Sequence, residues 1–157
     1  MRAGMSMLLA SAMLCCQAQA QMQMQEPAPA PVQPKTVNGL RYLCGGIGLD
    51  ESEYIKQQAK NGGLLLTFAA KDGSYLANVH VDVTDRRGKP VLQADCDGPL
   101  MLLDLPAAGN YRIRAESGGK TLVRTASLRG KGGSEVVFVW PVAGANGSAG
   151  QEAGQRP

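Results

Sequence analysis

Residues 75–84 of this chain read Tyr-Leu-Ala-Asn-Val-His-Val-Asp-Val-Thr, and this stretch decides the fold class. From Ala77 to Val83 a small apolar residue stands at every second position, and polar residues fill the positions between them. A period of two is the period of a β-strand that has one buried and one solvated face. Turn-forming residues at 71–73 and 85–90 bound the stretch on either side. The stretch therefore predicts a half-buried strand.

Similar short apolar stretches lie on both sides of it, and Gly, Asp, Asn or Pro separates each one from the next. They predict strands at residues 40–44, 64–70, 91–94, 99–105, 111–116, 120–128 and 135–140. A series of about eight short strands is typical of an all-β fold, here an antiparallel β-sandwich of about seven to eight strands. Because residues 64–66 are three successive leucines, we expect their strand to lie inside its sheet, covered on both faces.

One short helix is expected at residues 50–60, between the first two strands. Asp50 is the predicted N-cap, and Glu53, three residues later, is its predicted partner in a capping box. Asn61 and the two glycines that follow it predict the end of the helix.

The first twenty residues have the layout of a secretory signal peptide. Arg2 supplies the positive charge, residues 5–14 are apolar, and the small residues Ala18 and Ala20 mark a cleavage site. The apolar run is about half as long as the ~20 residues that a membrane-spanning helix needs, so we expect no transmembrane segment in the mature chain. The signal predicts a periplasmic or secreted protein.

A lipoprotein is the alternative localisation, because the signal ends near two cysteines. Bacterial lipoproteins resemble this pattern when a small residue immediately precedes the cysteine that is acylated. Here Leu14 precedes Cys15, and Cys15 precedes Cys16. The sequence therefore favours a soluble product over a lipid-anchored one.

Composition divides the rest of the chain into a folded centre and two tethers. Residues 21–37 are rich in Gln, Met, Pro and Ala, and residues 143–157 are rich in Gly and Ala. Neither segment has enough apolar side chains to offset the entropy of ordering, so both are expected to be disordered. The β-sandwich is expected to span residues 38–142. Met22 and Met24 could ligate copper, but two thioethers on a disordered tether make a poor site, and a linker is the preferred interpretation.

Cys44 and Cys96 are the two cysteines that remain once the signal is removed. In an oxidising compartment such a pair is expected to form a disulfide, which would tie the first strand to the middle of the domain. Two free buried thiols are the alternative, because geometry and not spacing decides whether two cysteines bridge. A metal site would need further ligands, and the chain has a single histidine, His80, and no Cys-x-x-Cys.

Two motifs carry a family resemblance. Residues 85–91, Asp-Arg-Arg-Gly-Lys-Pro-Val, and residues 103–113, Leu-Asp-Leu-Pro-Ala-Ala-Gly-Asn-Tyr-Arg-Ile, resemble the carboxypeptidase regulatory-like, transthyretin-like domain of a proteobacterial periplasmic family. The resemblance implies a transthyretin/Ig-like sandwich in which Pro106 and Gly109 reverse the chain and Tyr111 re-enters the core. It implies little about function, since these modules are accessory domains in very different proteins and are not themselves peptidases.

Catalytic residues are not expected. Hydroxyisourate hydrolase, the enzyme among transthyretin-like proteins, needs several histidines and a C-terminal Tyr-Arg-Gly-Ser, whereas this chain ends Gly-Gln-Arg-Pro. His80 and Asp82 could form a general base or a metal site, but a solvated pair on an exposed strand is the favoured interpretation. We expect no enzyme activity and no cofactor.

Calcium is a weaker alternative that the acidic residues leave open. Residues 95–98, Asp-Cys-Asp-Gly, resemble the opening of a calcium loop but lack its closing glutamate. The possibility rests on four aspartates that flank predicted strand ends: Asp82, Asp85, Asp95 and Asp97.

Arg112, Arg114 and Arg124 fall on two consecutive predicted strands and form the candidate binding surface. One hairpin register would place Arg114 opposite Arg124. Such a basic face would attract an anionic polymer of the envelope or an acidic patch on another envelope protein, and an ordinary wet sheet face is the alternative. Nucleic acid is not an expected partner, because the aromatic residues of such binders are missing.

These observations predict a non-catalytic exported module that serves as a binding or accessory protein of the cell envelope. A structural or stress-related envelope protein is the alternative, followed by a hydrolase with an unrecognised site. The net charge of +3 is too small to choose among them.

Overall fold

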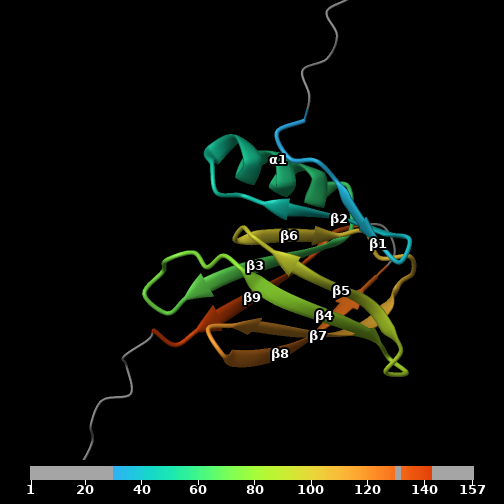
Figure 1. Ribbon diagram of the computed structural model, residues 1–157. Helices are drawn as coiled ribbons and strands as arrows, with labels where there is room; N and C mark the ends of the chain where they lie inside the picture. Colours follow the sequence, from blue (N-terminus) through green and yellow to red (C-terminus); the bar gives the residue numbers. More distant parts are fainter. Residues whose placement is uncertain (1–29, 130–131, 143–157) are drawn as a thin grey trace, which may run out of the picture.

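Strand β4, Val79–Asp85, contains most of the alternating stretch and lies inside a four-stranded antiparallel sheet, sheet B, of order β5-β4-β7-β8 (Figure 1). The computed structural model describes residues 30–129 and 132–142. Val79, Val81 and Val83 are fully buried, which confirms the predicted half-buried strand. The strand starts later than expected because Asn78 has a φ of 56°, a left-handed conformation that interrupts extended backbone.

Within the described residues the chain forms one helix and nine strands, which make up sheet B and a five-stranded sheet A of order β1-β2-β6-β3-β9. The all-β sandwich with one short helix is therefore confirmed (Figure 1). In chain order the other elements are β1 (Lys35–Val37), β2 (Leu40–Gly45), α1 (Leu49–Lys60), β3 (Leu64–Ala70), β5 (Pro90–Cys96), β6 (Leu100–Leu103), β7 (Gly109–Ser117), β8 (Lys120–Leu128) and β9 (Ser134–Trp140).

One strand pairing departs from the expected antiparallel arrangement. Strand β9 pairs with β3 in parallel, from Leu64 opposite Ser134 to Ala70 opposite Trp140. After β8 the chain leaves sheet B and enters sheet A at the end where β3 also begins, so the two strands run in the same direction. Alternation along a strand reports which face is buried and not its direction, which is why the sequence did not reveal this.

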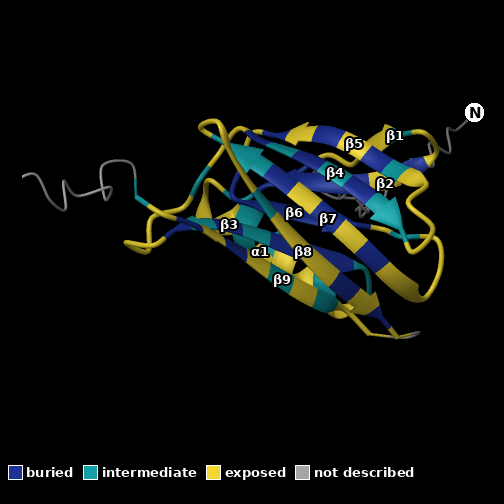
Figure 2. Ribbon diagram, turned by 90° about the horizontal axis from the view of Figure 1, so that it is seen from below, coloured by how far each residue is buried: buried dark blue, intermediate teal, exposed yellow. Residues whose placement is uncertain are grey.

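The main core lies between the two sheets. Each strand contributes alternate residues to it, and Figure 2 shows the resulting bands of buried and exposed residues along β7 and β8. At its β9 side the core holds three aromatic rings, whose centroids lie 5.8 to 6.2 Å apart: Phe68, Phe138 and Trp140. Tyr111 is also buried in the main core, as expected from its motif.

Helix α1 covers the outer face of sheet A and encloses a second, smaller core. Ile55 is fully buried against outward-facing leucines of the sheet, among them Leu65. Because Leu64 and Leu66 face the main core, β3 is covered on both sides, as the run of leucines predicted. No helix in the described part of the chain is long and apolar enough to cross a membrane.

The predicted capping box at the start of α1 is wrong. Gly48 is the N-cap, and no side chain caps the helix there. Glu51, not Glu53, reaches back: its Oε2 accepts hydrogen bonds from the backbone N–H groups of Gly46 at 3.0 Å and Ile47 at 3.3 Å. The carboxylate thus stabilises the turn that leads into the helix.

The fold begins before residue 38. Val32 is buried in the smaller core, and β1 pairs with β2, so the last part of the expected linker 21–37 belongs to the sandwich. Three residues are too few to display a period of two, and β1 therefore gave no signal in the sequence. Residues 21–29, the signal at 1–20 and the tail at 143–157 lie outside the described residues.

A disulfide joins the two sheets. Cys44 on β2 and Cys96 on β5 are bridged, with an S–S distance of 2.03 Å and a Cα–Cα distance of 5.6 Å. Both residues are buried. The predicted bridge is confirmed, and it fixes sheet A to sheet B within the main core.

Removing this bridge is expected to lower the free energy of unfolding by about 4 kcal/mol, because the disulfide restricts the loop between Cys44 and Cys96 in the unfolded chain. The measurement is urea unfolding of the Cys44→Ala/Cys96→Ala variant beside the parent chain. Reduction of the parent with a thiol should produce the same loss. Equal midpoints for the oxidised and reduced protein would contradict the expectation.

The turn between β5 and β6 depends on a glycine. A Cβ added to Gly98 would overlap the backbone carbonyl of Gly45 at the end of β2. We expect Gly98→Ser to lower the free energy of unfolding by about 1–3 kcal/mol, since the backbone must shift to admit it. Gly48→Ser is the matched control: its added Cβ meets open space, and serine is a good N-cap, so this variant should be as stable as the parent or more stable.

Candidate functional site

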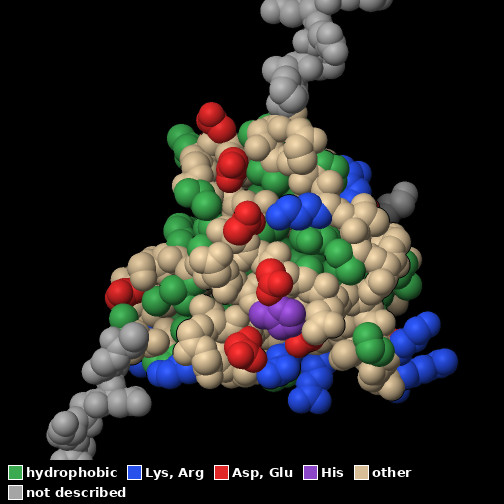
Figure 3. Space-filling view, viewed as in Figure 1, with side chains coloured by type: hydrophobic (Ala, Val, Ile, Leu, Met, Phe, Trp, Pro, Cys, Tyr) green, Lys and Arg blue, Asp and Glu red, His purple; other side chains and the backbone are tan. Residues whose placement is uncertain are grey.

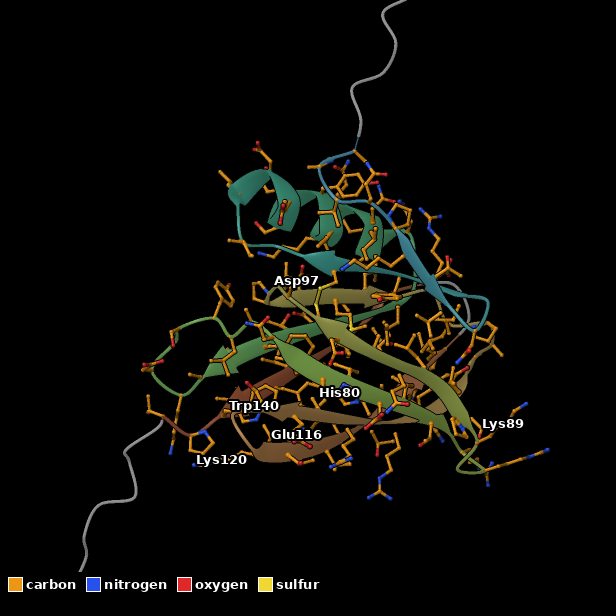
Figure 4. All side chains as sticks on the ribbon, viewed as in Figure 1. His80, Lys89, Asp97, Glu116, Lys120 and Trp140 are labelled. Carbon is orange, nitrogen blue, oxygen red and sulfur yellow. A yellow bond between two sulfur atoms is a disulfide. The ribbon has the colours of Figure 1, made fainter. Side chains whose placement is uncertain are left out.

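The outer face of sheet B carries the charged residues that the sequence singled out. His80 on β4 lies opposite Asp95 on β5 and Glu116 on β7, while Asp82 lies opposite Arg114. All of these positions alternate with the buried residues of their strands and therefore point to solvent. Figure 4 shows His80 and Glu116 on neighbouring strands, and Figure 3 shows the histidine ringed by acidic side chains.

His80 contacts two carboxylates. Its Nδ1 lies 2.6 Å from Oδ1 of Asp95, and its Nε2 lies 3.5 Å from Oδ1 of Asp82. The hydrogen bond to Asp95 raises the pKa of His80 above its usual value, and the negative charges of both aspartates add to the increase against a smaller opposing effect of burial. The imidazolium form is therefore stabilised on this face.

Arg114 on β7 contacts side chains on three strands, β4, β7 and β8. Its guanidinium lies 3.4 Å from Oδ2 of Asp82 and 3.1 Å from Oε2 of Glu116, and it donates a hydrogen bond to the hydroxyl of Thr121 at 3.4 Å. The side chain is 51% exposed, so it remains open to solvent while its charge is balanced by two carboxylates. The face is consequently a mixed-charge surface and not a basic one.

The three arginines of the candidate binding surface do not lie together. Arg112 shares the outer face with Arg114, but β7 pairs with β8 so that Arg114 lies opposite Val123 and Arg124 lies opposite the buried Ile113. Arg124 therefore leaves β8 from the other face, where its guanidinium donates a hydrogen bond to the carbonyl of Val123. The register that would have paired Arg114 with Arg124 is off by one residue, and one residue reverses the face.

The aspartates considered for calcium are dispersed. Asp95 contacts His80, and Asp82 contacts Arg114 in the middle of the sheet. Asp85 lies at one end of sheet B and accepts hydrogen bonds from turn N–H groups, whereas Asp97 follows β5 at the opposite end. They do not form the calcium site that was considered.

Asp97 lies beside the disulfide. Its Oδ1 is 3.0 Å from Sγ of Cys44 and 3.7 Å from Nζ of Lys35. The three side chains of Cys44, Cys96 and Asp97 are near enough to surround a metal ion, but the two sulfurs are bonded to each other and neither is a thiolate ligand. Asp97 instead forms an ion pair with Lys35.

The chemistry of this face is proton binding and ion pairing. The hydroxyl of Thr121 donates to Glu116 and accepts from Arg114, so it belongs to the ion-pair network and not to a dyad with His80. Sequence reasoning paired His80 with Asp82 and missed its shorter contact with Asp95. A bulge between Val83 and Thr84 shifts the register of this hairpin, so regular counting from the pair Thr84–Pro90 would have placed Ala94, and not Asp95, opposite His80.

Comparison with models of protein families and with curated proteins gives no match for this chain. The resemblance to the carboxypeptidase regulatory-like domain remains a prediction from its two motifs. Each motif contains local hydrogen bonds. In residues 85–91, Asp85 accepts from the N–H groups of Arg87 and Lys89, and in residues 103–113, the hydroxyl of Tyr111 donates to the carbonyl of Ala107 at 2.8 Å.

His80 is the single histidine of the chain, so its titration can be followed as one imidazole resonance by NMR. We expect Asp95→Asn to lower the pKa of His80 toward the usual value of about 6.5, because the main stabilising contact of the imidazolium is removed. Asp97→Asn is the matched control, since Asp97 contacts Cys44 and Lys35, and it should leave the titration in place.

The direction of the shift also fixes the pH dependence of stability. Because the pKa of His80 is higher in the folded state, the protonated histidine adds to the free energy of unfolding. This stabilisation is fully present below about pH 6.5 and is lost as the pH rises through the folded-state pKa. A His80 titration that is the same in the parent and in Asp95→Asn would contradict this account.

Proposed function

We propose that this chain is an exported, non-catalytic module that binds another protein of the cell envelope through the outer face of sheet B. The signal-like sequence at residues 1–20 supports export to the periplasm or beyond, and the buried disulfide suits an oxidising compartment. A surface that is already ordered before the partner arrives favours binding, since ordering side chains during association costs affinity.

The observation that carries the proposal is the network centred on Arg114. Residues from β4, β7 and β8 hold its guanidinium in place, and the strands beneath are fixed by a buried core. Val123, 38% exposed, lies opposite Arg114 and adds an apolar spot to the polar surface. A surface with mixed charges around an apolar contact area is typical of a protein–protein interface. Paired charges across such an interface contribute more to specificity and orientation than to affinity.

The test is capture of a partner by the full mature chain, immobilised and exposed to periplasmic extract of the source organism with chemical cross-linking. We expect one partner at a defined stoichiometry. Arg112→Gln/Arg114→Gln should reduce the captured amount by roughly tenfold or more, because the variant removes both arginines of this face. Circular dichroism and thermal melting establish that each variant is folded.

Lys120→Gln/Arg124→Gln is the matched control, with the same change in net charge. Both residues lie on β8, and Arg124 leaves the strand from the opposite face. This control should capture the partner as well as the parent does. Equal capture by the two double variants would contradict the proposal, and so would turnover of a substrate in a hydrolase screen that His80→Ala abolishes.

A further inference from the structure

The end of the sandwich at the β4–β5 hairpin is strongly basic. Arg86, Arg87 and Lys89 are exposed on the tip of this hairpin, and Arg112 lies on β7 opposite Thr84 at its base. Figure 3 shows basic side chains projecting at the lower right, and Figure 4, in the same view, labels Lys89 there. None of the four forms an ion pair within the described residues, in contrast to Arg114.

The acidic residues near this end offset only part of the charge. The Oδ1 of Asp85 accepts hydrogen bonds from the N–H groups of Arg87 and Lys89 at 2.8 and 2.9 Å, so this carboxylate is turned into the hairpin. Asp104 lies to one side, near Lys89. Most other carboxylates, among them Asp95, Asp97 and Glu116, belong to the opposite half of the sandwich. The domain is therefore electrically polarised, with its positive end at the hairpin.

The basic hairpin also borders a depression in the surface. A hollow of about 680 Å³ is lined by Arg86 and Arg87 together with residues 107–110. A second hollow of about 430 Å³ lies on the Lys89 side and shares Asp85, Ala107 and Tyr111 with the first. The two hollows thus adjoin across the base of the hairpin. Volumes of this size accommodate a small ligand or a unit of a polymer.

We infer that this end of the sandwich is a binding site for an anionic polysaccharide, whose sulfate, phosphate or carboxylate groups contact Arg86, Arg87 and Lys89. A polymer fits better than a single ion, because the cations are spread along two adjoining hollows. A concave surface beside a projecting hairpin can hold a polysaccharide chain, whereas it cannot lie flat against a lipid surface. The site is separate from the Arg114 network, and it rests on the proposed function only for the compartment in which the polymer is met.

The test uses heparin as the anionic polysaccharide, with the full mature chain in isothermal titration calorimetry at several salt concentrations. Arg86→Gln/Arg87→Gln/Lys89→Gln should bind heparin about tenfold more weakly at low salt, and its slope of log Kd against log salt should fall by about two to three. The matched control is Lys56→Gln/Lys71→Gln/Lys120→Gln, which removes three exposed cations elsewhere. This control should change Kd less than about twofold.

Two further arms separate the sources of anionic groups. Inorganic phosphate at millimolar concentration should compete only weakly with heparin, and vesicles of phosphatidylglycerol should bind the two triple variants equally. Equal weakening of heparin binding by both triple variants would overturn the inference, since the attraction would then be diffuse. Hairpin-dependent binding to vesicles without binding to heparin would overturn it in favour of a membrane surface.

The outcome is independent of the proposed function. Arg112→Gln/Arg114→Gln tests capture of the protein partner, whereas the hairpin triple variant leaves Arg114 and its contacts intact. Loss of heparin binding with retained capture would support the hairpin site alone. Unchanged heparin binding by the hairpin variant would remove the polysaccharide site and leave the protein-binding face untouched.

Discussion

Burial of the three valines of β4 is the constraint on which the rest of the sandwich depends. Val79, Val81 and Val83 have no exposed surface, and complete burial of each such side chain stabilises the fold by about 1.5–3 kcal/mol. Because side chains alternate along a strand, fixing these three inward also fixes His80 and Asp82 outward. The hairpin with β5 and the pairing with β7 then place Asp95 and Arg114 around them. The charged face is thus a consequence of the core.

The sequence predicted those features that depend on a local pattern. Alternation located most strands, three successive leucines predicted that β3 is covered on both faces, and the cysteine count suggested the bridge between Cys44 and Cys96. Features that depend on pairing between distant strands were missed. The face of Arg124 follows from a register set across the β7–β8 hairpin, and the parallel direction of β9 follows from a change of sheet. Neither the face of Arg124 nor the direction of β9 can be read from the residues next to them in the sequence.

The pairing of strands also explains why some basic side chains in the described part of this domain have carboxylate partners and others do not. In sheet B the register sets Asp82 and Glu116 beside Arg114, so this cation is balanced before any partner is met. On the hairpin the nearest carboxylate, Asp85, accepts hydrogen bonds from backbone N–H groups and forms no ion pair with a side chain of the described residues. A count of net charge does not distinguish these situations. Local hydrogen bonding decides which cations attract a ligand over distance and which ones orient a partner at contact.

The parallel pairing of β9 has a consequence for the assembly of the molecule. It joins Ser134 to Leu64 and Trp140 to Ala70, and hydrogen bonds from Ser134 and Trp140 to carbonyls of β8 close the side of the sandwich. A chain that emerges N-terminus first cannot make these contacts until almost all of it has been released. Contacts between such distant parts of a chain form slowly, so the edge of β3 and the ring of Phe68 stay open for that interval. During biogenesis, sheet A is the part of this protein that most needs shelter from aggregation.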